Sequence, residues 1–277
     1  MNKHAQLILL LLCFFISLNS YTQEPNLKHT EKWYFGYGAG LDFSSGEPVP
    51  LTDGQTNMDS HESSFVANDD EGNLLFYGNF GNIWNKNHEV LAGSENFGAT
   101  ESVTQIQCIK QPGNDSLYYI FHPVDIQPGT IYYSIININA DNGLGALISS
   151  QELVSQPATQ GIGAVLHCNG EDVWIATKQH GEKHLLSWLL TESGLELTPF
   201  ISNDIVQVPY TENVGVNIVF SPNGEKACVS YLSGSGTGDW GGSSFDLYEF
   251  NNCTGEFYNA INIPHSCVYG INFSPDN

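Results

Sequence analysis

Short apolar runs alternate with polar turns along most of this sequence. Four units each contain an apolar run, a turn rich in Pro, Asn, Asp and Gly, and a second apolar run: residues 64–67 and 74–77, 106–109 and 117–121, 164–167 and 173–176, and 218–220 and 227–231. Asn-Gly and Asp-Asn-Gly suit hairpin turns because these residues tolerate positive φ. Each unit therefore predicts an antiparallel strand pair, and further apolar runs predict later strands.

The turns recur at a similar spacing. Successive turns lie 42, 56, 54 and 53 residues apart, at Gly72, Asn114, Gly170, Gly224 and Asn277. The tripeptide Phe-Ser-Pro opens the last two, beginning at Phe220 and Phe273. A strand, a tight turn and a second strand that recur about every 50 residues are typical of a β-propeller. A β-sandwich also has many short strands but lacks such a recurring turn.

The predicted fold class is therefore all-β, a β-propeller of four-stranded antiparallel, WD-repeat-like blades. The sequence accounts for about four and a half blades, so we expect the N-terminal part of a ring of roughly six to eight blades. We interpret the aromatic run 33–43 as an edge strand that closes this ring against strands C-terminal to Asn277.

The first residues predict a secretory signal. Lys3 precedes an apolar run over residues 7–18, which is too short to span a membrane and fits a cleavable signal peptide. We assign residues 1–22 to the signal peptide, 23–32 to a linker and 33–277 to the propeller. No later run is long enough for a membrane span, so we expect a secreted protein or one on the outer cell surface.

The charge is strongly negative. The sequence has eight basic residues, all of them Lys, and 30 acidic residues, which gives a formal net charge of −22. Such a surface repels nucleic acid and anionic lipid, and without Arg no bidentate Arg–phosphate contact can form. Solubility outside the cell explains the acidity, and calcium binding by clustered acids is the alternative. The acidic turn 68–72 lacks calcium ligands at the required positions, so we expect no cofactor, with calcium left open.

Five of the six cysteines remain after signal removal, and an odd number leaves at least one unpaired. Cys108 and Cys228 lie within predicted strands and are interpreted as buried small hydrophobic residues. Cys253 and Cys267 flank a predicted strand pair and form the candidate disulfide if their strands are adjacent.

One glycine-rich segment invites a functional interpretation. Residues 236–241 fit G-x-G-x-x-G, but a strand-like alternation follows where a dinucleotide site needs a helix. We interpret the segment as a loop at the propeller rim and take four of its residues as a candidate ligand-binding loop. These residues are Gly236, Gly238, Asp239 and Trp240.

The histidines and the search for catalytic motifs do not indicate an enzymatic activity or a metal site. Five histidines lie in separate units, and a propeller can gather such residues on its axis as metal ligands or bases. Their unrelated spacing favours scattered, hydrogen-bonded residues instead, and the sequence has no G-x-S-x-G elbow and no P-loop. We therefore expect no catalytic and no metal-binding residues. The five histidines are His122, His167, His180, His184 and His265.

Several segments resemble one group of exported proteins. They are residues 33–36 with 39–43, 71–77 with 83–88, 112–114 leading to 118–121, and 220–224. Their order is similar to that in Bacteroidetes surface proteins named for a gliding-motility-associated C-terminal domain, the type B sorting domain of type IX secretion. The resemblance implies export by that route and immunoglobulin-like or PKD modules C-terminal to the propeller. It brings no catalytic residues.

These observations favour a non-catalytic extracellular or cell-surface module for binding or adhesion, with a glycan or protein ligand. On this interpretation the chain is not an enzyme. The alternative is a propeller hydrolase or lyase with an axial metal site, which requires acids or histidines to converge in the central channel. A third hypothesis is a structural spacer that presents C-terminal modules.

Overall fold

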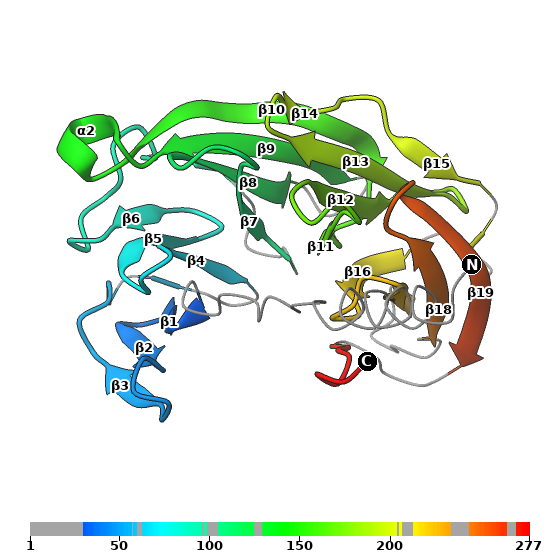
Figure 1. The fold of residues 1–277 in the computed structure, drawn as a ribbon, viewed down its shortest axis with the longest axis horizontal. Helices are drawn as coiled ribbons and strands as arrows, with labels where there is room; N and C mark the ends of the chain where they lie inside the picture. Colours follow the sequence, from blue (N-terminus) through cyan, green and yellow to red (C-terminus); the bar gives the residue numbers. More distant parts are fainter. Residues whose placement is uncertain are drawn as a thin grey trace, which may run out of the picture.

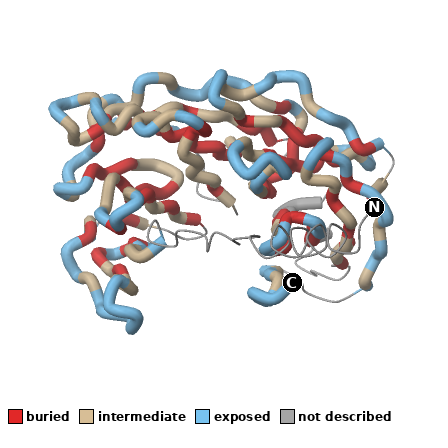
Figure 2. Tube along the Cα trace, viewed as in Figure 1, coloured by how far each residue is buried: buried red, intermediate tan, exposed pale blue. Residues whose placement is uncertain are grey.

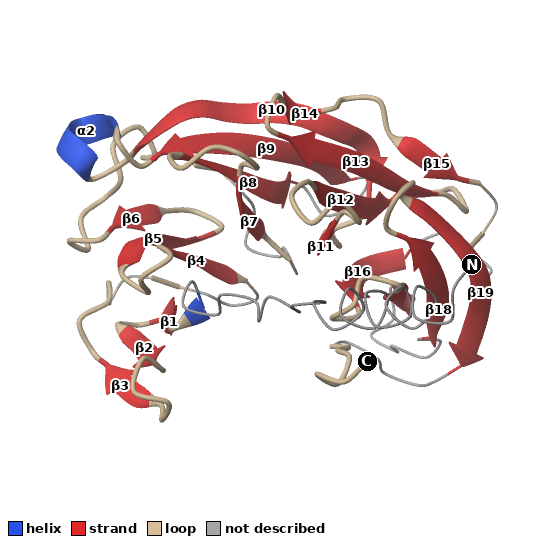
Figure 3. Cartoon of the chain, viewed as in Figure 1, coloured by secondary structure: helices blue, strands red, loops and turns tan. Residues whose placement is uncertain are grey.

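The computed structural model describes residues 30–56, 58–59, 63–95, 97–98, 105–124, 129–203, 205–206, 213–233, 244–264 and 270–277. In these ranges the regular structure is almost entirely β-strand, as Figure 3 shows. The one helical element drawn with a label, α2 (Ala140–Gly143), connects two strands. None of the described helical residues forms a segment long and apolar enough to cross a membrane. The expected signal peptide lies outside the described residues.

The strands form five antiparallel sheets, which we name A to E in chain order. Sheet A contains β1 (Lys32–Gly36), β2 (Ala39–Asp42) and β3 (Val49–Leu51), and sheet B contains β4 (Ser64–Asn68), β5 (Leu74–Asn79) and β6 (Ile83–Asn85). Sheet C contains β7 (Gln107–Lys110), β8 (Leu117–Val124), β9 (Gly129–Asn137) and β10 (Ala146–Ala158). Sheet D contains β11 (Gly163–Leu166), β12 (Val173–Lys178), β13 (Leu185–Thr191), β14 (Gly194–Leu195) and β15 (Phe200–Ser202). Sheet E contains β16 (Asn213–Phe220), β17 (Lys226–Ser233), β18 (Ser244–Asn251) and β19 (Glu256–Pro264).

The sheets are arranged radially. In Figure 1 they follow one another around an arc, with β1, β4, β7, β11 and β16 on its inner side and β3, β6, β10 and β19 on its outer side. Within each sheet every strand pairs with the next along the chain, except that β14 and β15 both pair with β13. This arrangement confirms the predicted β-propeller of antiparallel blades. The number of blades in an intact ring stays a prediction.

Each boundary between neighbouring sheets has its own apolar core, and Figure 2 shows the buried residues between the sheets. Strand β8 shows how one strand contributes side chains to two cores. Tyr118 and Ile120 join the core shared with sheet B, and the alternate residues Tyr119 and Phe121 join the core shared with sheet D. Successive side chains of a strand point to opposite faces, so one strand supplies both cores. Radial stacking therefore buries both faces of an inner sheet.

The recurring turns are confirmed in detail. In each turn a backbone N–H donates to the carbonyl oxygen three residues earlier. Glycine or asparagine suits the donor position of the last two turns because φ is positive there, 72° at Gly224 and 76° at Asn277. The donor–acceptor pairs are Gly72–Asp69, Asn114–Gln111, Gly170–His167, Gly224–Ser221 and Asn277–Ser274.

The segment 33–43 was expected to be an edge strand, and the structure corrects this. It forms two strands of a separate sheet, with Trp33 opposite Leu41, and β3 is the third strand. The chain reverses at Gly36, Tyr37 and Gly38, all of which have positive φ. Two glycines in three residues permit this tight reversal, so the aromatic run cannot continue as one strand. Closure of a ring by this sheet stays a prediction.

Candidate functional site

Two clefts lie on either side of β4, at boundaries between sheets. Cleft 1, of about 260 Å³, is bordered by β1 and β4, and its lining includes Lys32, Trp33 and Phe35. Cleft 2, of about 350 Å³, is bordered by β4, β7 and β8. Val66 and Asn68 of β4 line both clefts, and we call the two clefts together the inner wall.

A lysine at cleft 2 brings together carboxylates from two sheets. Lys110 Nζ lies 3.1 Å from Asp115 Oδ1 and 3.7 Å from Asp70 Oδ2. Asp70 belongs to the turn after β4 and lines the cleft, whereas Asp115 belongs to the turn after β7. Because both carboxylates contact one nitrogen, these two oxygens are no more than about 7 Å apart, and glycoside-hydrolysing carboxyl pairs lie roughly 5–9.5 Å apart.

The three charged side chains are partly or largely exposed, with relative exposures of 36% for Lys110 and 66% for Asp70. Ion pairs this exposed contribute at most about 1 kcal/mol to stability, because water screens them. The contact of the two acids with Lys110 therefore contributes little to the stability of the fold.

The floor of cleft 2 is neutral. Burial raises the pKa of the Cys108 thiol, so this cysteine is not a reactive thiolate. Burial, followed by the negative charges nearby, also raises the pKa of the Tyr118 phenol, which stays protonated and can donate a hydrogen bond. The lining of cleft 2 thus offers one carboxylate, one ammonium group and a phenol donor to a polar ligand, and the exposed Asp115, outside this lining, adds a second carboxylate beside Lys110.

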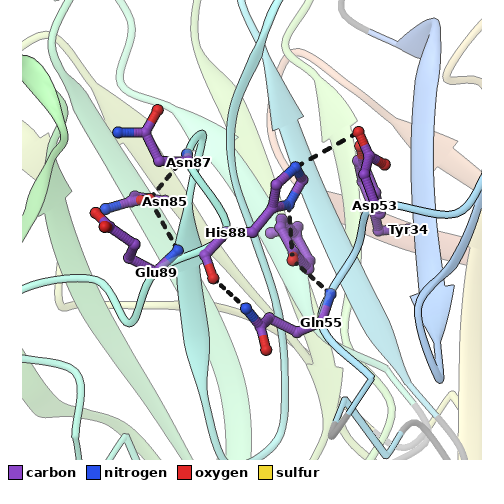
Figure 4. A network of polar contacts seen from close by, with 8 residues as sticks. Tyr34, Asp53, Gln55, Asn85, Asn87, His88 and Glu89 are labelled. Atoms are coloured by element: carbon purple, nitrogen blue, oxygen red, sulfur yellow. Dashed lines mark hydrogen bonds and ion pairs between the residues drawn. The ribbon is translucent and has the colours of Figure 1, made fainter.

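A second polar cluster joins sheets A and B and is shown in Figure 4. The ring of His88 contacts Tyr77 Oη through Nδ1 at 3.0 Å and Asp53 Oδ2 through Nε2 at 3.6 Å. Tyr34 donates to Asp53 at 3.0 Å, and the backbone N–H of Gln55 donates to Tyr77 Oη at 2.9 Å. The Gln55 side chain also donates to the His88 carbonyl.

The loop that carries His88 is organised by Asn85. The Asn85 side-chain oxygen accepts from the backbone N–H groups of Asn87 and Glu89, at 2.9 and 3.2 Å. His88 itself has φ of 63°, a left-handed conformation that is uncommon for a residue with a side chain. The surrounding hydrogen bonds hold it there.

This His88 cluster resembles an acid–base relay, but its burial argues for a structural role. Tyr77 is fully buried, and burial raises the pKa of Tyr77 to about 12, so the phenol stays neutral. Burial and the neighbouring Asp53 likewise raise the pKa of Tyr34. Neither cleft is lined by His88. We interpret the cluster as a clamp between sheets A and B.

The structure corrects the predicted disulfide. Cys253 is bonded to Cys168, not to Cys267, which lies outside the described residues. The turn after β11 and the turn after β18 meet at the boundary of sheets D and E, where Trp174 Nε1 and the Cys168 N–H both donate to the Asn252 carbonyl, at 2.8 and 3.1 Å. The disulfide therefore joins two cysteines that are close in space but 85 positions apart in the sequence, and not the two that flank the predicted strand pair. Cys108 and Cys228 are free; Cys228 is buried, as expected, whereas Cys108 is half-buried and lines cleft 2.

The other sequence-predicted residues are not brought together. The candidate loop of Gly236, Gly238, Asp239 and Trp240, and also His265, lies outside the described residues. His122 is buried on β8, His167 lies in the turn after β11, and His180 and His184 lie in the β12–β13 connection. Within the described ranges, no three His, Cys, Asp or Glu residues are grouped so that they could hold a metal ion.

Sequence reasoning missed Asp70, Lys110 and Asp115. Asp70 and Asp115 are 45 positions apart, but both belong to the recurring turn. Superposing successive turns would have placed an acid in each at the same end of neighbouring blades, and this was the signal available.

No protein-family model and no curated protein matches this chain. Solved structures that resemble it include the GH43_1 enzyme from Xanthomonas citri complexed with xylotriose, at 10% identity and a TM-score of 0.32. The same enzyme complexed with xylose matches at 8% identity and a TM-score of 0.28. Each match covers 83% of this chain and 73% of the other.

These neighbours are enzymes, which contradicts the prediction from the sequence that this chain is not an enzyme. We withdraw that prediction. TM-scores of this size identify neither a reaction nor a substrate for this chain.

Proposed function

We propose that the chain is a propeller hydrolase that cleaves a glycosidic bond of a carbohydrate bound on the inner wall. The observation that carries this proposal is the approach of Asp70 and Asp115, from neighbouring blades, to the same Lys110 ammonium group, of which Asp70 and Lys110 line cleft 2. Glycoside hydrolysis commonly needs two carboxyl groups at about this separation.

The two carboxyl groups have complementary roles. One donates a proton to the glycosidic oxygen as the sugar leaves, and the other activates a water molecule or attacks the anomeric carbon. Lys110 holds both side chains near one point and limits their mutual repulsion. The Tyr118 phenol, in the lining of cleft 2, donates a hydrogen bond to a sugar hydroxyl in this proposal.

The charge of the protein restricts the substrate. A net charge of −22 disfavours sulfated or uronic-acid polymers, which carry negative charges themselves. A neutral glycan avoids this repulsion, and its hydroxyl groups match the mixed donors and acceptors of cleft 2.

The proposed setting is extracellular. A disulfide between Cys168 and Cys253 favours an oxidising compartment, and the apolar segment 7–18 suits export. Export through the type IX route and attachment to further modules rest on the sequence resemblance alone.

The experiment is to measure reducing-sugar release from a panel of neutral polysaccharides by the wild-type protein and by Asp70→Asn and Asp115→Asn. Each variant should lose about 100-fold or more of the rate, because each removes one acid–base partner. Glu225→Gln is the control, since Glu225 is an exposed acid in the corresponding turn of sheet E. Wild-type rates in both Asn variants, or no hydrolysis by the wild-type protein across the panel, contradict the proposal.

A further inference from the structure

Each of the two proposed catalytic acids follows directly after a residue whose side chain closes the turn. Asp70 follows Asp69, and Asp115 follows Asn114. Asp69 and Asn114 are half-buried, whereas Asp70 and Asp115 are exposed. The side chain that closes each turn is thus less exposed than the acid beside it.

The Asp69 carboxylate holds the turn of sheet B. Its Oδ1 accepts from the backbone N–H groups of Glu71 and Asn73, at 3.0 and 2.7 Å, and its Oδ2 accepts from Asn73 Nδ2 at 3.0 Å. The Asp69 N–H also donates to the Asn73 carbonyl at 2.9 Å. Asp70 lies within this closed turn, so its backbone is held on both sides.

The Asn114 amide has the same role in the turn of sheet C. Its Oδ1 accepts from the backbone N–H groups of Ser116 and Leu117, at 2.9 and 3.1 Å, and from the Ser116 hydroxyl at 3.0 Å. Asp115 lies between Asn114 and Ser116, so its backbone is also held on both sides. A carboxylate closes one turn and an amide closes the other, which indicates that the accepting oxygen matters and the charge of Asp69 does not.

We propose that Asp69 and Asn114 are positioning residues for the proposed reaction. They fix the backbones from which Asp70 and Asp115 reach the Lys110 ammonium group. The inference rests on the proposed function for its effect on catalysis, but not for its effect on the contacts of Lys110. Water screens exposed ion pairs, so the contacts with Lys110 give the two carboxylates little order by themselves. Fixed backbones supply this order, and a displacement of about 1 Å can cost roughly 100-fold in rate.

The turn of sheet D supplies a matched control. The Asn169 side-chain oxygen accepts from the backbone N–H groups of Glu171 and Asp172, both at 3.1 Å. Gly170 follows Asn169, where sheets B and C have an aspartate. Asn169→Ala therefore removes the same kind of turn hydrogen bonds without a proposed catalytic acid beside them.

The first measurement is kcat and KM for a neutral polysaccharide that the wild-type protein hydrolyses. Asp69→Ala, Asn114→Ala and Asn169→Ala should all lower the melting temperature, because each loses turn hydrogen bonds. Only Asp69→Ala and Asn114→Ala should lower kcat, by about 10-fold or more, with KM changed by less than about 3-fold. Asp69→Asn should keep most of the wild-type kcat, since its amide oxygen still accepts in the turn.

The second measurement does not depend on hydrolysis. Acetic anhydride acetylates lysine amines, and peptide mass spectrometry measures the rate at Lys110 against that at Lys86, an exposed lysine outside both clefts. A nearby carboxylate favours the ammonium form of a lysine, which does not react. Lys110 should therefore react about 3-fold or more faster in Asp69→Ala and Asn114→Ala than in the wild-type protein, and at the wild-type rate in Asn169→Ala.

The outcomes separate this inference from the proposed function. Wild-type kcat in all three alanine variants, with unchanged acetylation of Lys110, overturns the inference and leaves the proposed function standing. Equal losses of kcat in Asn114→Ala and Asn169→Ala also overturn it, because the stability of the turns then explains the effect. Faster acetylation of Lys110 in Asp69→Ala and Asn114→Ala, without hydrolysis by the wild-type protein, contradicts the proposed function and supports the placement of the two carboxylates alone.

Discussion

The side-chain oxygen of Gln105 accepts a hydrogen bond from the backbone N–H of Ile218 at 2.9 Å, across 113 positions of the sequence. The same oxygen accepts from the Ile162 N–H at 3.1 Å, and Gln105 Nε2 donates to the Ile218 carbonyl at 3.2 Å. Gln105 precedes β7, Ile162 precedes β11 and Ile218 lies in β16. One amide thus joins sheets C, D and E on the inner side of the arc.

Gln105→Met should lower the free energy of unfolding by about 2–5 kcal/mol, because it leaves backbone groups of Ile162 and Ile218 without their partner. Urea unfolding followed by tryptophan fluorescence measures the change. Gln107→Met is the control. The Gln107 side chain donates to the Ile162 carbonyl at 2.8 Å, and the loss of this hydrogen bond is expected to cost about 1 kcal/mol. Equal losses of unfolding free energy in the two variants contradict the claim that Gln105 joins three sheets.

The disulfide between Cys168 and Cys253 closes a sequence separation of 85 residues. Replacing both cysteines by alanine should cost about 2–5 kcal/mol, because the unfolded chain regains freedom. A reductant should lower the melting temperature of the wild-type protein and leave that of the double variant unchanged. Peptide mapping that finds Cys253 bonded to Cys267 contradicts the pairing.

Gly255 and Gly170 offer a matched pair for testing the contact of sheets D and E. Both have positive φ, 77° and 79°, so alanine introduces similar backbone strain. A Cβ at Gly255 would lie 2.8 Å from the Trp174 ring, whereas a Cβ at Gly170 meets no atom within 4 Å. Gly255→Ala should therefore lower the melting temperature clearly more than Gly170→Ala. Equal shifts mean that the turn does not pack on Trp174.

His122 should make stability depend on pH. Burial lowers the pKa of His122 to about 4 from its ordinary value of 6.5. Between these values the unfolded state binds more protons than the folded state, so stability rises with pH. The contribution is present above pH 6.5 and is lost as the pH falls to about 4, up to about 3 kcal/mol. His122→Phe should flatten unfolding curves measured across this range. An unchanged slope contradicts the buried, neutral imidazole.

Much of the fold could be predicted from local sequence. Turns such as Pro222-Asn223-Gly224 specify their own geometry, because proline fixes φ and glycine permits positive φ, and their recurrence predicted the propeller. Sheet A was harder, because the glycines at Gly36 and Gly38 reverse a run whose aromatic residues alone read as one strand.

The candidate site was not predicted, because its residues meet only in three dimensions. Lys110 approaches Asp70 from the adjacent blade, and Cys253 finds Cys168 through the contact of two turns. Nothing near His88 in the sequence indicates its contacts with Asp53 and Tyr77. Radial packing of the sheets decides all of these contacts.

The central claim is that Asp70 and Asp115 act together on one glycosidic bond, and kcat/KM for a neutral polysaccharide in a double-mutant cycle tests it most directly. Catalytic residues that act as a unit are strongly non-additive, so Asp70→Asn with Asp115→Asn should be within about 10-fold of the slower single variant. Two single variants with wild-type kcat/KM, or losses that multiply in the double variant, contradict the account.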